Sequence, residues 1–233
     1  MFLRPLPVRD PEGLLWVSNQ TAEGRQDSLG WLDYLDLKES KGVFADMAAQ
    51  SRRGGLLEGQ AEAELVLLTV VSDNYFSVLG VEAARGRLFR ADADAALGNE
   101  PAIVISDSLW RRRFGADPAL VGRAIRMNSR AFTVVGVLPP EFRGLERSVR
   151  NDVWAPVSTW QAMGNRREFE QRGAGQFEVL ARLRPGATIE QAQAQLDAIT
   201  RRFQQDHPEA HRGRRLAAAS EETRRSARGV RPS

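Results

Sequence analysis

Few residues in this chain of 233 are placed to do chemistry. It has no cysteine, which excludes a thiol nucleophile, a thiolate metal site and a disulfide. The two histidines, His207 and His211, are separated by Pro208, without the third ligand of a zinc site nearby. We therefore expect them to be a solvated pair just beyond the end of a helix.

Two aspartates in an acidic stretch, Asp92 and Asp94, resemble the beginning of a calcium-binding loop. Their spacing is incomplete, and no bidentate glutamate stands at the distance that such a loop requires. The chain also contains no G-x-S-x-G motif of a hydrolase and no G-x-x-x-x-G-K-[ST] loop that would hold ATP phosphates. The sequence therefore predicts no catalytic residue, no metal and no cofactor.

Arginine-rich segments raise a second possibility, binding to nucleic acid or to an acidic membrane surface. The net charge is only +3, but the tail from Arg201 onward carries nine arginines against four acidic residues. Residues 111–113 are also arginines and follow Trp110, yet the dipole of a helix favours cations at its C-terminus. After Arg212 the tail has no aromatic residue that could stack on a base. We therefore expect no nucleic-acid partner.

The elements that position these residues are clearest over residues 101–142. A β-branched run at 103–105 predicts a buried strand, and Ser106 stands where the N-cap of a following helix belongs. Gly115 predicts the left-handed end of that helix. Strands at 123–127 and 131–138 follow, joined by a two-residue turn at Asn128 and Ser129. Four aromatic residues are expected in the core of this region: Trp110, Phe114, Phe132 and Trp154.

The flanking segments predict further regular elements. The amphipathic stripe that follows Thr188 indicates the clearest helix, with Thr188 and Gln191 forming a capping box. Residues 164–175 are expected to form an exposed loop, Gly54 and Gly55 a turn, and residues 221–233 a disordered tail without a core-forming pattern. Helices are predicted at 28–39 and 73–79, and strands at 14–17, 63–71, 177–183 and 216–219.

Composition is that of an ordinary globular domain, with 42% hydrophobic and 27% charged residues. No apolar run approaches the roughly 20 residues that span a bilayer, and residues 1–7 lack the apolar core of a signal peptide. Taken literally, these features predict a soluble cytoplasmic protein.

A further signal comes from five segments, residues 72–89, 102–128, 132–144, 152–156 and 181–199. They strongly resemble the MacB-like periplasmic core domain, the extracytoplasmic part of ABC transporter permeases of the MacB and FtsX-like group. The likeness runs through most of the chain in the family's order, and Ser129 departs from it where the family usually has glycine. Residues 3–17 resemble the sequence after the first membrane helix of large acidobacterial-type permeases.

The resemblance implies an α+β fold in two subdomains. A porter-like βαβ subdomain would be built from both chain ends, residues 1–85 and 176–220, and a second mixed α/β subdomain, residues 86–175, would be inserted between them. Strand 177–183 should then pair with strands from the first ninety residues. Strand 103–105 and the hairpin at 123–138 should form a separate sheet.

The resemblance also implies a function. The chain would be an excised domain on the periplasmic side of the bacterial inner membrane, and it would not be an enzyme. It would couple ATP-driven motion of membrane helices to a substrate or partner outside the membrane. Its partners would be the membrane helices of the same permease, a separate ATP-binding subunit or domain and a possible periplasmic protein. Two alternatives are a free-standing extracytoplasmic domain that binds a ligand or peptide, and a cytoplasmic nucleic-acid-binding protein.

Overall fold

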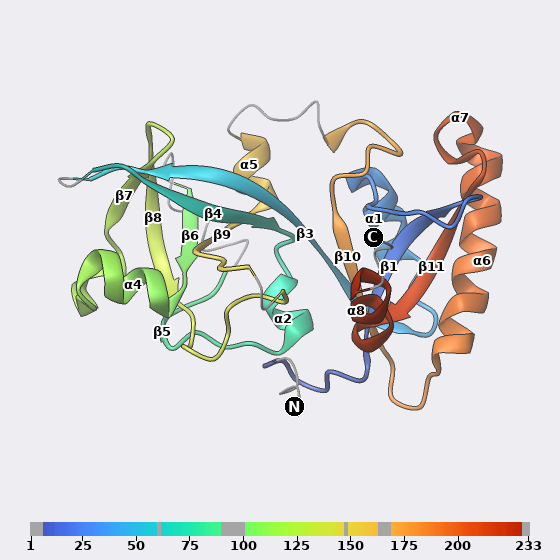
Figure 1. The fold of residues 1–233 in the computed structure, drawn as a ribbon, viewed down its shortest axis with the longest axis horizontal. Helices are drawn as coiled ribbons and strands as arrows, with labels where there is room; N and C mark the ends of the chain where they lie inside the picture. Colours follow the sequence, from blue (N-terminus) through green and yellow to red (C-terminus); the bar gives the residue numbers. More distant parts are fainter. Residues whose placement is uncertain (1–6, 60–61, 90–100, 147–148, 163–168, 230–233) are drawn as a thin grey trace. The chain divides into compact units, whose positions relative to one another are not determined.

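The computed structural model describes residues 7–59, 62–89, 101–146, 149–162 and 169–229, in mixed α/β structure (Figure 1). Asp92 and Asp94 lie outside these residues. The strands are β1 (Leu14–Thr21), β2 (Gln26–Asp27), β3 (Phe44–Leu57), β4 (Glu64–Val71), β5 (Arg85–Gly86), β6 (Ala102–Ile105), β7 (Ala124–Met127), β8 (Arg130–Val137), β9 (Val153–Pro156), β10 (Glu178–Leu183) and β11 (Arg214–Ser220). The helices are α1 (Trp31–Glu39), α2 (Tyr75–Leu79), α4 (Asp107–Phe114), the 3-10 turn η1 (Pro118–Leu120), α5 (Val157–Ala162), α6 (Ile189–Asp206), α7 (Pro208–His211) and α8 (Glu221–Gly229).

The chain divides into two compact units. The terminal unit comprises Asp10–Ala49 and Asn165–Ser233, and the middle unit comprises Met1–Arg9 and Gln50–Gly164. These bounds differ from the expected ones, because residues 50–85 belong to the middle unit instead of joining the chain ends. The reason is strand pairing: β4 is bonded to the second half of β3 on one side and to β9 on the other.

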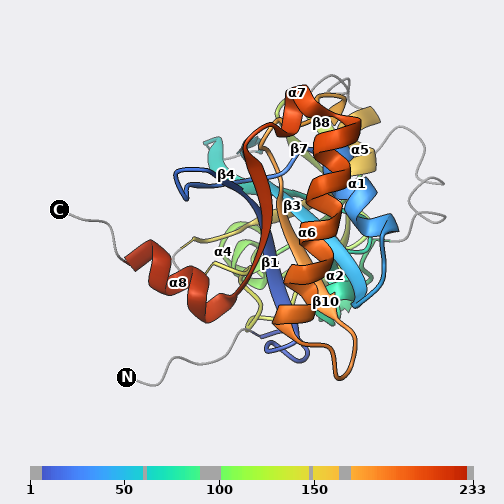
Figure 2. The ribbon, with the colours of Figure 1, turned by 90° about the vertical axis from the view of Figure 1, so that its right-hand side faces the viewer.

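The sheet of the terminal unit has the strand order β11-β1-β10-β3. β1 is antiparallel to both β10 and β11, so the predicted pairing of strand 177–183 with the first ninety residues is confirmed. Four successive residues of β1, from Leu14 to Val17, are buried, which indicates cover on both faces. Figure 2 shows α6 and α8 on opposite sides of β1 and β11.

Helix α6 begins at the capping box that the sequence predicts, with Thr188 and Gln191 bonding reciprocally. Its side chains also reach the free edge of β11. Gln193 donates from Nε2 to the carbonyl of Leu216 at 3.0 Å and accepts from the amide of Ala218 at 3.0 Å. These bonds satisfy backbone groups that an edge strand would otherwise leave open to another chain.

In the middle unit the strands close into a ring, β3-β4-β9-β6-β8-β7, and β7 returns to β3 through the pair Leu57 and Met127. All four residues of β6 and of β9 are buried, as expected of strands covered on both faces. The ring includes β3, whose first residues belong to the terminal unit. The separate sheet expected for β6 and the 123–138 hairpin is therefore wrong, since β3 and β4 also belong to it.

The two glycines at 54 and 55 form no turn, contrary to the prediction, because β3 continues through them to Leu57. Gly55 is buried, and a Cβ atom added there would lie 2.8 Å from the sulfur of Met127. The glycine thus leaves room for the side chain of Met127 on β7, a role that a sequence pattern cannot distinguish from a turn.

The local signals of the 101–142 region are confirmed. Ser106 caps α4 by accepting from the amide of Leu109 at 3.0 Å, and Gly115 ends the helix in the left-handed conformation. Asn128 and Ser129 both have positive φ, 51° and 62°. These values suit the type I′ turn that matches the twist of a two-residue hairpin.

Other predicted boundaries differ. Helix α1 begins at Trp31 and not at 28, because the side chain of Asp33 accepts from the amide of Gly30 and fixes the start there. Phe169 lies within the expected exposed loop but is buried, and its ring lies 5.7 Å from that of Phe177. The tail expected to be disordered contains helix α8.

Candidate functional site

The four aromatic residues predicted for the core differ in burial. Trp154 and Phe132 are fully buried, and Trp110 is 4% exposed. Phe114 is only partly buried, because it is the last residue of α4. The indole nitrogen of Trp110 donates to the carbonyl of Asp117 at 2.8 Å, which ties α4 to the following turn.

An aromatic cluster surrounds Trp154 inside the middle unit. The ring centroid of Phe142 lies 5.9 Å from that of Trp154, and the centroid of Phe76 lies 6.2 Å away. The three residues come from β9, from the segment after β8 and from α2, so the cluster joins elements far apart in the sequence. Phe76 and Phe142 are absent from the predicted core, since neither lies in a strong periodic pattern.

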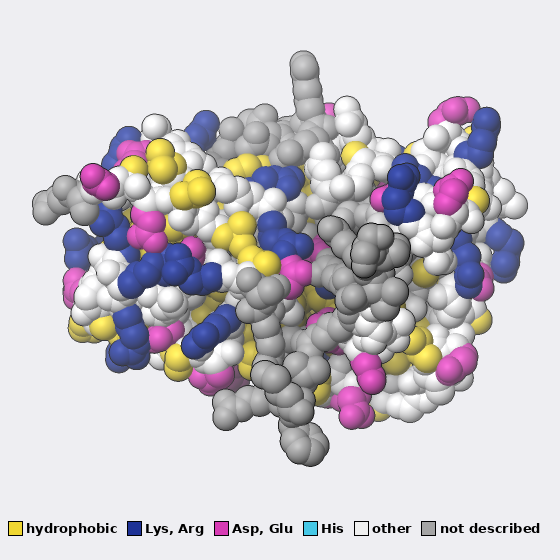
Figure 3. All heavy atoms as spheres, viewed as in Figure 1, with side chains coloured by type: hydrophobic (Ala, Val, Ile, Leu, Met, Phe, Trp, Pro, Cys, Tyr) yellow, Lys and Arg dark blue, Asp and Glu magenta, His cyan; other side chains and the backbone are white. Residues whose placement is uncertain are grey.

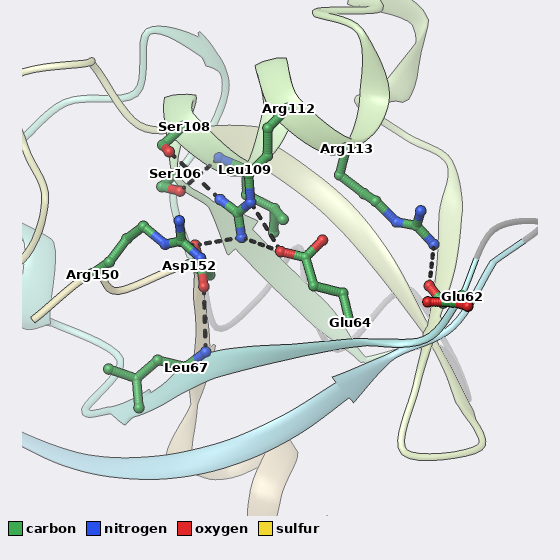
Figure 4. A network of polar contacts seen from close by, with 10 residues as sticks. All are labelled: Glu62, Glu64, Leu67, Ser106, Ser108, Leu109, Arg112, Arg113, Arg150 and Asp152. Carbon is green, nitrogen blue, oxygen red and sulfur yellow. Dashed lines mark hydrogen bonds and ion pairs between the residues drawn. The ribbon is translucent and has the colours of Figure 1, made fainter.

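A polar network lies beside the ring of strands in the middle unit (Figure 4). The guanidinium of Arg112 binds Glu64 of β4 at 2.7 Å and Asp152 at 2.9 Å. Arg150 approaches the same Asp152 oxygen at 3.6 Å, and the second oxygen of Asp152 lies 3.4 Å from the amide of Leu67. The network thus links α4, β4 and the entry to β9.

The charged side chains of this network differ in their exposure to solvent. The side chain of Asp152 is 3% exposed and that of Arg112 is 26% exposed. Burial alone would lower the pKa of Arg112, but its bonds to Glu64 and Asp152 outweigh this effect and raise the pKa. Arg111 pairs with Asp107, and Arg113 donates to the carbonyl of Glu62. The three arginines of α4 are thus all engaged within the chain.

The terminal unit contains a buried carboxylate that the sequence analysis missed. Asp33 of α1 is fully buried, and its carboxylate receives the backbone amides of Gly173 at 3.0 Å and Gly30 at 3.3 Å. Arg172 bridges it to Asp36 on the surface of α1. Burial would raise the pKa of Asp33, but the adjacent imidazole of His211 and the hydrogen bonds from these amides outweigh burial and lower it.

The sequence predicts that His207 and His211 form a solvated pair, and this prediction is wrong for His211. It is 3% exposed, and its Nε2 lies 3.2 Å from an Asp33 oxygen. The short helix α7 turns the chain back after α6, so that the imidazole lies 5.0 Å from the ring of Phe203. His207 caps the end of α6 instead and lines an open polar cavity of about 500 Å³ together with Arg172.

Helix α8 is fastened to the terminal sheet by Trp16 of β1. The indole nitrogen of Trp16 donates to Glu221 at 2.7 Å, and the guanidinium carbon of Arg224 lies 3.5 Å from the centre of the indole ring. Arg224 also forms an ion pair with Glu178 of β10. We call these four residues the α8 clamp.

The sequence does contain a signal for α8. Ser220 accepts from the amide of Thr223 at 3.2 Å, as an N-cap does, and acidic residues occupy the first turn. The signal was missed because the segment has no apolar stripe. Its binding to the sheet uses a stacked arginine instead.

Within the described parts of the chain, no three metal-binding side chains gather into a possible metal site. No helix found there is long and apolar enough to cross a membrane. The geometry therefore offers packed clusters and ion-pair networks that connect distant elements.

Comparison with known proteins shows which family of domains the chain matches. Residues 4–199 match the family model described as the MacB-like periplasmic core domain. Two curated relatives are similar to shorter segments. The macrolide export ATP-binding/permease protein MacB 1/2 of Paracoccus denitrificans is 33% identical over 139 residues, 60% of this chain and 20% of that protein. MacB 1 of Aeromonas hydrophila is 30% identical over 99 residues, 42% of this chain and 15% of that protein. The chain is thus similar to a fifth or less of the length of these relatives.

Solved structures share the fold at low sequence identity. A domain of a putative permease from Porphyromonas gingivalis has a TM-score of 0.67 and 19% identity, covering 97% of this chain and 95% of that one. The periplasmic region of MacB from Actinobacillus actinomycetemcomitans has a TM-score of 0.64 and 15% identity, covering 96% and 95%. The extracellular domain of the noncanonic ABC-type transporter YknZ from Gram-positive bacteria has a TM-score of 0.63 and 14% identity, covering 88% and 99%.

Proposed function

Because this chain belongs to the family of MacB-like periplasmic core domains, we propose that it couples ATP-driven motion of a permease to a substrate or partner outside the membrane. The observation that carries the proposal is the family match over most of the chain. In this reading the chain is one part of a longer permease, and it lies on the extracytoplasmic side of the bacterial inner membrane.

The internal contacts support a role in passing on motion. A relay needs rigid bodies whose elements move together. The Arg112 network and the aromatic cluster around Trp154 tie distant segments of the middle unit together. The Asp33 cluster and the α8 clamp do the same in the terminal unit.

The names of the curated relatives suggest which ATP-binding part and which substrate belong to the longer permease. Two of them are named as macrolide export ATP-binding/permease proteins. We propose that ATP is hydrolysed by a separate subunit or domain, that the transport direction is export, and that a macrolide is the first substrate to test.

Two other functions compete with this one. A free-standing extracytoplasmic binding domain would also be secreted, but it would have no membrane helices in its reading frame. A nucleic-acid-binding protein would need a surface of unpaired basic and aromatic side chains. On the face seen in Figure 3, Lys and Arg side chains lie interspersed with Asp and Glu. We therefore expect the isolated chain to bind DNA or RNA only weakly, without sequence preference, and to hydrolyse no nucleotide.

Location can be tested with cysteine labelling, since the chain has no native cysteine. The Glu209 side chain is 92% exposed, whereas Ala192 is fully buried. In intact spheroplasts that make the longer permease, a membrane-impermeant maleimide should label Glu209→Cys rapidly and Ala192→Cys only after denaturation. Labelling of Glu209→Cys only after lysis would place the chain in the cytoplasm and contradict the proposal. The reading frame should also encode membrane helices on both sides of the domain.

Coupling can be tested by separating ATP binding from export. A core substitution such as Trp154→Phe should reduce macrolide export from cells while the permease still binds ATP and reaches the membrane in normal amount. Unchanged export by several such variants would contradict a coupling role.

A further inference from the structure

The C-terminal helix α8 is attached to the sheet mainly through polar and stacking contacts. It follows β11 directly, so that Ser220 ends the strand and Glu221 begins the helix. The side chains of Arg224 and Glu178 are 14% and 17% exposed, so their ion pair is partly shielded from solvent. The Trp16 ring is 5% exposed and receives the Arg224 guanidinium on its face.

Such a helix cannot be stable without its contacts. It has nine residues, and isolated helices shorter than about 12 residues are marginal in water. Its sequence also offers no apolar stripe that could pack it elsewhere. Docking on Trp16 and folding of α8 are therefore linked, so that a release of the contacts would also unfold the helix.

The position of α8 determines whether a displacement reaches the sheet. Helix α8 is joined to the sheet by the strand-to-helix junction at Ser220 and by the α8 clamp. While the clamp holds, a displacement of α8 moves β1 and β10 through Trp16 and Glu178. Once it releases, the same displacement is absorbed by unfolded residues of α8 and does not reach the sheet.

We propose that the α8 clamp is a releasable latch, whose docked state passes movement of α8 to β1 and β10. The inference rests on the proposed function, because it names the contact by which that motion would enter the terminal unit. Its two states are distinguished by contacts made only in the docked state, as a switching element requires.

The docked state can be measured by trypsin, because α8 contains Arg224, Arg225 and Arg228. Cleavage of a folded segment follows the population of its open state when reclosing is fast. In the 233-residue chain, Glu178→Gln and Trp16→Phe leave these cleavage sites intact but weaken the clamp. Each should raise the rate of cleavage within α8 by about fivefold, as expected for the loss of one partly shielded polar contact.

Glu209→Gln provides a matched control. It makes the same charge change as Glu178→Gln, but its side chain is 92% exposed and lies outside both α8 and the clamp. Its rate of cleavage within α8 should stay within about twofold of the native rate. Circular dichroism melts should show that all three variants keep the fold of the remaining chain. Equal rates of cleavage within α8 for Glu178→Gln and Glu209→Gln would overturn the latch.

Whether the α8 clamp contributes to coupling can be tested in the longer permease. Macrolide-stimulated ATP hydrolysis and macrolide export should both fall severalfold in Glu178→Gln and stay native in Glu209→Gln. If Glu178→Gln speeds cleavage in α8 but leaves both activities native, the latch is overturned while the proposed function stands. If the unaltered permease shows neither activity with macrolides and its labelling places the domain inside the cell, the proposed function itself fails.

Discussion

The hydroxyl group of Thr200 on α6 accepts a hydrogen bond from the backbone amide of Leu216 on β11 at 3.0 Å. It donates at the same time to the carbonyl of Leu196, one turn earlier in the helix, at 2.8 Å. A helix side chain therefore occupies the position that the carbonyl of another strand would take. Gln204 takes the complementary place of a strand amide, donating from Nε2 to the carbonyl of Arg214 at 2.8 Å. Together with Gln193, these residues close the edge of the terminal sheet.

Replacing Thr200 by valine should destabilise the terminal unit. The substitution keeps the shape of the side chain but leaves the buried amide of Leu216 without a partner, which costs about 1–3 kcal/mol. Urea unfolding of the 233-residue chain measures the change. Thr200→Ser keeps the hydroxyl group and should lose less than half as much. Equal stability of the valine variant and the native chain would show that the bond contributes nothing.

Trp110 and Phe114 should respond differently to truncation, although the sequence places both on one helical face. Trp110 is 4% exposed, so Trp110→Ala should cost roughly 3–5 kcal/mol and lower the melting temperature of the middle unit. Phe114 is only partly buried, and Phe114→Ala should cost less than half of that amount. Thermal melts of the two variants make the comparison. An unchanged melt for Trp110→Ala would contradict the packing of α4.

Because of the buried carboxylate of Asp33, the stability of the folded chain should depend on pH in the acidic range. Its pKa is lowered in the folded chain despite burial, because the adjacent His211 and the hydrogen bonds from the amides of Gly173 and Gly30 favour the ionised form. The resulting stabilisation is complete above the unfolded pKa of about 3.9 and is lost as the pH falls through the lower folded pKa. Asp33→Asn should be less stable than the native chain at pH 6, and the difference should shrink below about pH 4. A difference that is constant from pH 6 to pH 3 would contradict this assignment.

The Arg112 and Asp152 pair should show strong coupling in a double-mutant cycle. Removing Arg112 alone leaves the carboxylate of Asp152 buried at 3% exposure, with only the longer contacts to Arg150 and to the amide of Leu67. Arg112→Met and Asp152→Asn should therefore be non-additive by about 1–3 kcal/mol. The i,i+4 pair of Arg111 and Asp107 on the same helix, whose arginine is 62% exposed, is the control and should couple by about 0.3–0.5 kcal/mol. Similar coupling in the two pairs would contradict the shielding of Asp152.

Local signals in the sequence predicted local structure well. The caps at Ser106 and Thr188 and the left-handed end at Gly115 depend on residues within one helical turn, so a single segment contains the whole signal. Gly55 was misread because the reason for the glycine, the sulfur of Met127, lies on a distant strand. Strand 177–183 was paired correctly with the first ninety residues, whereas the membership of β3 in both units depends on pairings that no local pattern records.

The candidate functional residues were less predictable than the fold. Asp33 and His211 lie far apart in the sequence, and each one alone has the pattern of a surface residue. Trp16 could be assigned to a buried strand, but its contact with Arg224 depends on a helix that lacks an apolar stripe. Polar clusters of this kind are assembled by tertiary structure, whereas the hydrophobic pattern records only the core.

Hydrogen exchange in the longer permease tests the central claim most directly. The claim is that ATP acting elsewhere in the permease changes the state of this domain, although the domain itself binds no nucleotide. Exchange should be measured by mass spectrometry on the permease in lipid nanodiscs, without nucleotide and with ATP in a hydrolysis-deficient variant. The isolated 233-residue chain with and without ATP is the control and should show no difference.

We predict that ATP alters exchange in peptides of this domain within the permease, with the largest change in α8 and in β1, which contains Trp16. Identical exchange in all peptides of the domain, while peptides of the ATP-binding part respond to ATP, would contradict the claim that the domain couples ATP-driven motion.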